Sequence, residues 1–231
     1  MAKKRSKRYL AALKKLGTAG AKYPVAEAVE ILKKMEGARF DETVELAIKL
    51  GVDPKKADQI IRGSFALPNG LGKENRVIAF AEGPAADECR KAGAIEVGTE
   101  DLAKKIEGGW MDFDVAIAHP SAMRFVGKLG RILGPQGKMP SPKSGTVTEN
   151  VATAVREFKG GKIEYRADAA GNVQVPVGRK SFPAEKLVEN IEAFIEHVRA
   201  SRPSSAKGSF LQRATLSATM SPGIDLAVVQ A

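Results

Sequence analysis

The hydrophobic pattern changes its period twice along the chain, and this limits the folds that the chain can adopt. Apolar and polar residues alternate over residues 40–50 and 210–219, which predicts amphipathic strands. Between them, residues 67–159 hold short apolar runs separated by stretches at helical spacing, which predicts βαβ units on a small parallel sheet. We therefore expect an α/β fold: an α+β domain made from residues 1–66 plus 160–231, with an inserted, Rossmann-like three-layer α/β domain over residues 67–159. The two joins should lie close together, which favours a hinge.

Local patterns predict the individual elements. In the terminal domain we expect helices over 9–16, 25–35, 54–62 and 182–197, and strands over 40–50, 64–67 and 210–219. In the inserted domain we expect strands over 77–81, 95–97 and 115–118, and helices over 85–92, 102–106, 121–133 and 150–158. Residues 134–145, rich in Gly, Pro and Ser, should form a loop. A hairpin is expected over 163–177, and residues 222–231 should be a loose tail.

The charge of the chain points to a polyanionic partner. Lys and Arg number 37 against 27 Asp and Glu, a net charge of +10, which favours nucleic acid first and an anionic membrane surface second. No apolar run approaches the roughly 20 residues of a membrane span. Residues 67–159 hold 13 basic and 12 acidic residues, so nearly all of the surplus lies in the terminal domain. The basic segment at residues 3–8 is either a solvated tail or an arm that binds nucleic acid.

Few residues suggest catalysis or metal binding. A single cysteine, Cys89, excludes an internal disulfide and fits a reducing cytoplasm, and its alanine-rich helix predicts that it is packed. Cys89, His119 and His197 lack the spacing of a zinc site, so we expect no metal and no cofactor. Asp112 and Asp114 are expected at the polar edge of a strand, and His119 in a turn. We expect no catalytic residue.

The glycine-rich segment 130–138 resembles a phosphate-binding loop. It departs from the G-x-x-x-x-G-K-[ST] spacing, because Ile132 stands in place of the first glycine and Met139 in place of the hydroxyl residue. A nucleotide-dependent enzyme that uses the inserted domain is therefore an alternative hypothesis. A general RNA chaperone is a third.

The last expected strand has one face that suits RNA. Its polar face carries Ser209, Arg213, Thr215, Ser217 and Thr219, and its apolar face carries Ala214, Leu216, Ala218 and Met220. Hydroxyl groups with one arginine suit phosphates and 2′-OH groups, although exposed Ser/Thr-rich strands are common in soluble sheets. Phe40 fits either base stacking or the core, because it shares the parity of Val44 and Leu46, and these residues alone leave the choice open.

Four segments resemble one known family. They are GKLGRILGPQGKMPSPKSGTV at 127–147, KLGVDP at 49–54, GWMDFD at 109–114 and FDETVE at 40–45. They are similar to the family of large ribosomal subunit protein one, in its bacterial form, and the similarity runs over essentially the whole chain. The glycine- and proline-rich segment is the most specific of the four.

This resemblance implies a structural constituent of the large ribosomal subunit and not an enzyme. The protein would bind large-subunit ribosomal RNA at the mobile stalk beside the tRNA exit site and assist the release of deacylated tRNA. It would also repress translation by binding the messenger RNA of its own operon. The partners are then ribosomal RNA, exit-site tRNA and that messenger, with no membrane. The protein would be cytoplasmic, on the ribosome, and a monomer when free of it.

The resemblance also implies RNA contacts at particular residues. These are Arg39, Phe40, Glu45, Lys49, Arg166, Asp168, Gly171, Ser217, Thr219 and Met220. It places Phe40 in contact with RNA. It also places Met220 in contact with RNA, although alternation puts Met220 on the apolar face of its strand. Secondary contacts are expected from Lys138 and Lys143 in the inserted domain.

Two departures from the family pattern concern RNA binding. Ser221 stands where the family usually has glycine, so backbone approach to RNA should differ locally, because serine restricts positive φ. In the loop 166–171, relatives often carry Asn and Lys where this chain has Ala167 and Ala169. We therefore expect weaker messenger binding, and tighter binding when both side chains are restored.

Overall fold

The chain forms two compact units in the computed structural model, which describes residues 6–17 and 20–227. Unit 1 holds the described residues up to Ile61, residues 67–72 and the described residues from Tyr165 onward; unit 2 holds Arg62–Ala66 and Lys73–Glu164. Both units combine helices with strands, which confirms the expected α/β fold class. Lys3, Lys4 and Arg5 of the basic segment and residues 228–231 of the expected tail lie outside the described residues.

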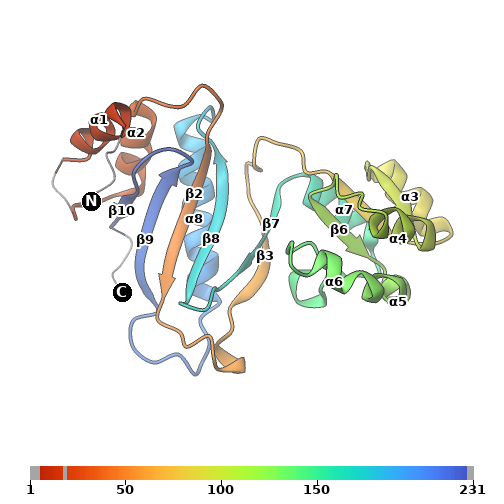
Figure 1. The fold of residues 1–231 in the computed structure, drawn as a ribbon. Coiled ribbons are helices and arrows are strands. Elements are labelled where there is room, and N and C mark those ends of the chain that lie inside the picture. The colour runs from red at the N-terminus through yellow and green to blue at the C-terminus, as the bar shows by residue number, and fades with distance from the viewer. Residues whose placement is uncertain (1–5, 18–19, 228–231) are drawn as a thin grey trace. The chain divides into compact units, whose positions relative to one another are not determined.

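Unit 1 is built on a five-stranded sheet with the order β1-β10-β9-β2-β8 (Figure 1). The strands are β1 Lys22–Tyr23, β2 Thr43–Leu50, β8 Asn172–Arg179, β9 Leu211–Ala218 and β10 Ile224–Leu226. The helices are α1 Lys7–Lys15, α2 Val25–Lys34, the 3-10 turn η1 Ala57–Gln59 and α8 Ala184–Ala200. β2 runs antiparallel to both β8 and β9, and β10 runs antiparallel to β9 and parallel to β1.

Alternation places the core of unit 1 on one face of this sheet. In β2 the residues Val44, Leu46, Ile48 and Leu50 are at most 1% exposed, and α2 and α8 pack against this face. Each large aliphatic side chain buried there contributes about 1.5–3 kcal/mol. The other face carries Glu45 and Arg213, both exposed, so the expected faces of β2 and β9 are confirmed.

Unit 2 is built on a three-stranded parallel sheet with the order β5-β4-β6. The strands are β4 Val77–Phe80, β5 Glu96–Gly98 and β6 Val115–Ala118, and the longer helices are α3 Pro84–Ala92, α4 Glu100–Glu107 and α7 Val151–Lys159. Two apolar clusters surround the sheet: one includes Ile106, Phe113 and Val126, and the other includes Cys89, Val155 and Phe158. β3 Arg62–Ala66 and β7 Lys162–Arg166 form a separate two-stranded sheet.

Residues 121–133 are helical as expected, but they form four short consecutive segments and not one α-helix. The structure has η2 Pro120–Ala122, α5 Met123–Val126, η3 Gly127–Leu129 and α6 Gly130–Leu133. Gly127 and Gly130 lie where α5 and η3 end, both with right-handed helical backbone angles, and glycine stabilises a helix interior by about 1 kcal/mol less than alanine. The loop over 134–145 is confirmed, apart from the 3-10 turn η4 Pro142–Ser144. Similarly, only η1 forms within the helix expected over 54–62.

The hairpin expected over residues 163–177 is also wrong. Both strands exist, but β7 pairs with β3 and β8 pairs with β2. Two backbone hydrogen bonds, from Asp168 N–H to the Asn172 carbonyl at 2.8 Å and from Gly171 N–H to the Asp168 carbonyl at 3.0 Å, close the turn between them. Alternation shows which face of a strand is buried but not which strand lies beside it, so the local pattern could not find these partners.

The tail expected over residues 222–231 is ordered in its first half. Ile224 and Leu226 are buried, and their strand β10 lies between β1 and β9. The short alternation Ile224-Asp225-Leu226 accounts for this, because both apolar side chains reach the core while Asp225 stays on the polar face. β10 thus completes the sheet that carries the candidate site.

Candidate RNA interface

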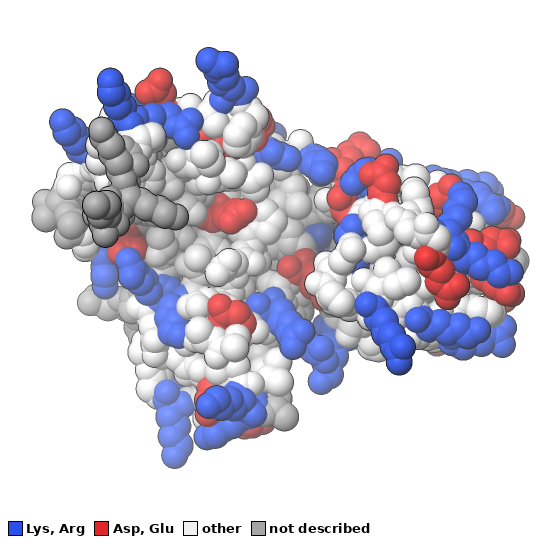
Figure 2. Space-filling model, in the orientation of Figure 1, with Lys and Arg blue, Asp and Glu red and all other residues white. Residues whose placement is uncertain are grey.

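The polar face of the unit 1 sheet brings together residues from three strands. The register places Glu45 opposite Ser217 and Pro176, Ala47 opposite Thr215 and Gln174, and Lys49 opposite Arg213 and Asn172. Figure 2 shows this face with Lys and Arg mainly around its border and with Asp or Glu side chains among uncharged residues nearer its centre. It therefore offers hydroxyl, amide and carboxylate groups in its middle and positive charge mainly at its margin.

Two large apolar side chains stand exposed at one end of this face. Phe40 is 56% exposed and Met220 is 51% exposed. The parity that would have placed Phe40 in the core is wrong, because β2 begins only at Thr43. The alternation that placed Met220 on the apolar face is wrong as well, because β9 ends at Ala218. Arg39, beside Phe40, is also exposed.

Glu42 joins the two segments that carry these side chains. It is 2% exposed, and its carboxylate accepts hydrogen bonds from the backbone N–H groups of Ala38 and, at 3.4 Å, of Met220. Thr219 is fixed in the same place, because its N–H donates to the Thr43 carbonyl at 3.0 Å and its hydroxyl accepts from Thr43 N–H at 3.1 Å. Glu42 was not predicted as a site residue, although it occupies an apolar position in the alternation of β2.

A pocket of about 360 Å³ lies beside Thr219 and Met220. Its other lining residues are Ser6, Arg8, Tyr9 and Ser221, so the start of α1 contributes to it. Ser221 does not adopt a positive φ, since only glycines do so among the described residues. Its hydroxyl instead accepts from Ala218 N–H at 2.8 Å and closes the turn after β9.

The loop between β7 and β8 is shaped by Asp168. Its carboxylate accepts hydrogen bonds from the backbone N–H and the side-chain amide of Asn172, at 2.8 and 2.9 Å, and from Ala170 N–H at 2.8 Å. These bonds, those from Asn172 first, lower the pKa of Asp168. Gly171 is buried with φ +77°, and a Cβ there would lie 3.2 Å from the Leu50 carbonyl oxygen. The ammonium of Lys49 donates to the Ala170 carbonyl, which ties the loop to β2.

Arg213 is a further basic group of this face. It pairs with Asp225, Nη2 to Oδ2 at 2.7 Å, and the Thr215 hydroxyl donates to the same carboxylate at 2.8 Å. Burial alone would raise the pKa of Asp225, but the hydrogen bonds from Arg213 and Thr215 outweigh it and lower the pKa. Asp225 was not predicted as a partner of Arg213, because residues 222–231 were expected to form a loose tail and not the strand β10. Arg166, on β7, is exposed.

Unit 2 holds the two lysines expected to make secondary contacts. Lys143 is exposed in η4. Lys138 is half-buried, and its ammonium donates to the backbone carbonyls of Met111 and Phe113 at 3.2 and 2.6 Å, so it helps to fix the glycine-rich segment. Nothing in the sequence pattern indicated these hydrogen bonds of Lys138.

The other candidates for chemistry in unit 2 have structural partners. Asp112 and Asp114 pair with Arg76, and His119 accepts a hydrogen bond from Ser121 N–H, so their expected places at a strand edge and in a turn are confirmed. Cys89 is buried as expected, and burial raises the pKa of its thiol. Residues 6–17 and 20–227 contain no cluster of His, Cys, Asp and Glu that could hold a metal ion.

Comparison with known families gives a match over most of the chain. The model of the ribosomal protein L1p/L10e family matches residues 32–222, well over half of the 231 residues. The match includes β2, β8 and β9 with the polar face described above. No helix in the described part of the chain is long and apolar enough to cross a membrane. The chain therefore belongs to the ribosomal protein L1p/L10e family and is a protein of the large ribosomal subunit that binds ribosomal RNA.

Proposed function

We propose that the polar face of unit 1, with the segments that carry Phe40 and Thr219-Met220, is the surface that binds ribosomal RNA. The observation that carries this proposal is that the buried carboxylate of Glu42 joins two segments whose exposed side chains are Phe40 and Met220. A large apolar side chain held at an exposed position favours a partner with flat apolar surfaces. Unstacked RNA bases have such surfaces, and stacking on an aromatic ring contributes about 1–3 kcal/mol per base.

The remaining residues supply the other contacts that RNA requires. Thr43, Ser217 and Thr219 present hydroxyl groups, which suit the 2′-OH groups that distinguish RNA from DNA. Arg39, Arg166 and Lys49 provide positive charge for phosphates, and Glu45 provides an acceptor for base amino groups. The pocket beside Met220 offers room for one unstacked base. Asp168 and Gly171 act by giving the loop its conformation.

In the ribosome, this surface would hold the mobile stalk of the large-subunit RNA beside the tRNA exit site and assist the release of deacylated tRNA. The same surface would bind the messenger RNA of the protein's own operon and repress its translation. Units 1 and 2 would act as two domains, and Lys143 and Lys138 in unit 2 would add secondary RNA contacts. The protein would act without catalysis, on cytoplasmic ribosomes, and as a monomer when free of them.

The alternatives make different predictions. A nucleotide-dependent enzyme would need Lys138 for its phosphates, but the ammonium of Lys138 already donates to two backbone carbonyls. Turnover of a nucleotide that Lys138→Ala abolishes would support that alternative. A general RNA chaperone would bind RNAs of equal length equally well.

Binding of a stalk RNA fragment and of a scrambled RNA of equal length, each measured over a series of salt concentrations, tests the proposal. We expect a preference for the stalk RNA that persists at high salt. Phe40→Ala should weaken stalk binding by about 5- to 150-fold, which corresponds to about 1–3 kcal/mol of stacking. Ile95→Ala is the matched control, because Ile95 is 50% exposed but lies in unit 2. Equal affinities for both RNAs, or equal losses in the two variants, would refute the proposal.

A further inference from the structure

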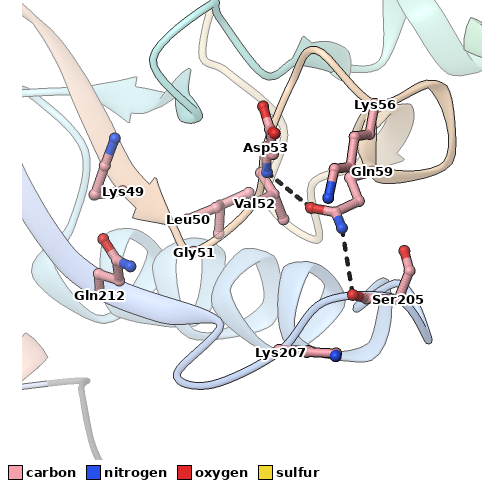
Figure 3. Close-up of a pocket in the computed structure, with 10 residues that line it drawn as sticks. All are labelled: Lys49, Leu50, Gly51, Val52, Asp53, Lys56, Gln59, Ser205, Lys207 and Gln212. Atoms are coloured by element: carbon pink, nitrogen blue, oxygen red, sulfur yellow. Dashed lines mark hydrogen bonds between the residues drawn. The ribbon is translucent and has the colours of Figure 1, made fainter.

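A second pocket, of about 500 Å³, lies in unit 1 where β2 ends and β9 begins (Figure 3). Its lining includes Lys49, Asp53, Lys56, Gln59, Lys207 and Gln212. Lys49 belongs both to this pocket and to the polar face of the sheet, so the pocket continues the proposed RNA surface at its far end. The resemblance to known proteins suggested no role for Lys56, Lys207 or Gln212.

The walls of this pocket are held by a buried amide. Gln59 is 8% exposed, its Oε1 accepts from Asp53 N–H at 2.8 Å, and its Nε2 donates to the Ser205 carbonyl at 3.3 Å (Figure 3). Gly51 allows the two chain segments to touch, because a Cβ there would lie 2.2 Å from the Ser209 carbonyl oxygen. These contacts join the segment after β2 to the segment before β9, so the pocket is a built feature and not a gap between side chains.

The pocket has an excess of positive charge. Lys56 and Lys207 are exposed, and neither ammonium forms a hydrogen bond or an ion pair within the described ranges 6–17 and 20–227. The only carboxylate in the lining, Asp53, accepts Lys55 N–H at 3.1 Å. The nearby Asp58 is outside the lining, and its pKa is lowered chiefly by the Ser205 hydroxyl and to a smaller extent by Lys56. Gln212 adds an exposed amide that can donate to an anion.

We propose that this pocket is a phosphate-binding subsite that takes a backbone phosphate of the RNA bound on the polar face. The proposal rests on the proposed function and extends it beyond Lys49. Two ammonium groups that form no hydrogen bond or ion pair within the described ranges, a third that donates to the Ala170 carbonyl and is shared with the RNA surface, and an amide donor match a phosphodiester. Lys56 and Lys207 then contribute affinity without reading sequence, because phosphate contacts are the same for every base.

The salt dependence of RNA binding tests this subsite. Each phosphate contact lowers log K by about 0.7–0.9 per decade of salt, so the double variant Lys56→Ala/Lys207→Ala, which loses the contact with one phosphate, should reduce the slope by about 0.7–0.9. The same relation predicts about five- to tenfold weaker binding per lost contact at about 0.1 M salt. The control is Lys91→Ala/Lys186→Ala, which removes two exposed lysines of α3 and α8, and α8 packs on the apolar face of the sheet. An unaltered slope, or an equal change in the control, would overturn the proposal.

NMR signals of the Gln59 and Gln212 side-chain amides test the phosphate subsite independently of the proposed function. Stalk RNA should shift both signals, and Thr219→Ala should leave the shift in place at saturating RNA. Adenosine monophosphate at the same concentration should not shift them. A shift caused by the mononucleotide alone would mean that the pocket serves free nucleotides and would overturn the RNA assignment. Loss of the preference for stalk RNA with the salt effect of the double variant intact would refute the proposed function but not the subsite.

Discussion

Removal of the Glu42 carboxylate should destabilise unit 1 and weaken RNA binding together. The side chain is 2% exposed and accepts hydrogen bonds from the backbone N–H groups of Ala38 and Met220. In Glu42→Ala both amides lose a charged acceptor, and neither donates to another side chain within residues 6–17 and 20–227. The segments of Phe40 and Met220 then lose the group that joins them. We predict a loss of stability in unit 1 and a loss of affinity for stalk RNA.

The expected loss of stability follows from these two bonds. A hydrogen bond to a charged group contributes about 1.5–3 kcal/mol, and an unsatisfied buried amide costs about 1–3 kcal/mol. The bond from Met220 is long at 3.4 Å and Met220 is half-exposed, so water will replace part of that contribution. We therefore expect Glu42→Ala to lower the free energy of unfolding by about 2–4 kcal/mol. Glu42→Gln keeps one acceptor oxygen and should lose about half as much.

The aromatic residues allow the two units to be followed separately. Tyr9, Tyr23 and Tyr165 all lie in unit 1, and the single tryptophan, Trp110, lies in unit 2. In a urea titration of Glu42→Ala, near-UV tyrosine absorbance should show a lower unfolding midpoint for unit 1. Trp110 fluorescence, which reports unit 2, should keep the midpoint of the unaltered protein. A tyrosine transition within about 0.5 kcal/mol of the unaltered protein would refute the role of Glu42 in stability. Lost stability with unchanged affinity for stalk RNA would refute its role in the interface.

Three further predictions concern loops and buried groups of unit 1. Hydrogen bonds, chiefly from Asn172, lower the pKa of Asp168, so the carboxylate should stabilise its loop fully above the unfolded pKa of about 3.9. That contribution should disappear as the pH falls through the lower folded pKa. NMR shifts of the loop amides, followed with pH in the unaltered protein and in Asp168→Ala, would show this loss. Ala169→Lys adds a cation at an exposed position and should tighten messenger binding about five- to tenfold. Ala167→Asn places an amide where alanine is 8% exposed, so it should lower the urea midpoint of unfolding. Burial lowers the pKa of His197, whose Nε2 lies 2.8 Å from the Tyr165 hydroxyl. The unfolded chain therefore takes up the proton at a higher pH than the folded one, and unit 1 should lose stability as the pH falls below about 6.5. Equal urea midpoints at pH 7.5 and 5.5 would contradict this.

Local periodicity predicted the parts of the fold that depend only on neighbouring residues. The faces of β2 and β9 followed from alternation, since successive side chains in a strand point to opposite sides. The partners of β7 and β8 did not follow, because pairing depends on residues far apart in the chain. The strand β10 was missed for the same reason: three residues become a strand only when β1 and β9 lie on either side of them.

The residues of the candidate site also divide into those that local alternation predicts and those that depend on the fold. The hydroxyl face of β9 was visible in the sequence, but the position of Phe40 depended on where β2 begins, which alternation alone did not settle. Glu42 carried one signal, a carboxylate at an apolar parity position, and its meaning required the fold that brings Ala38 and Met220 to it. Lys56 and Lys207 gave no signal, because single exposed lysines are ordinary surface residues until a pocket places them together.

Discrimination between RNAs and salt dependence should reside in different residues of this interface. Hydroxyl groups release no counterions when they bind RNA, so Thr219→Ala should lower stalk-RNA affinity by a similar factor, about five- to tenfold, at every salt concentration. Arg39→Gln should instead lower the slope of log K against log salt by about 0.7–0.9 and weaken stalk and scrambled RNA alike. Binding of both RNAs to both variants, measured at four or more salt concentrations, separates the two effects. If Thr219→Ala changes the slope as much as Arg39→Gln does, Thr219 acts by placing cations through its bonds to Thr43, and the hydroxyl face does not itself recognise RNA.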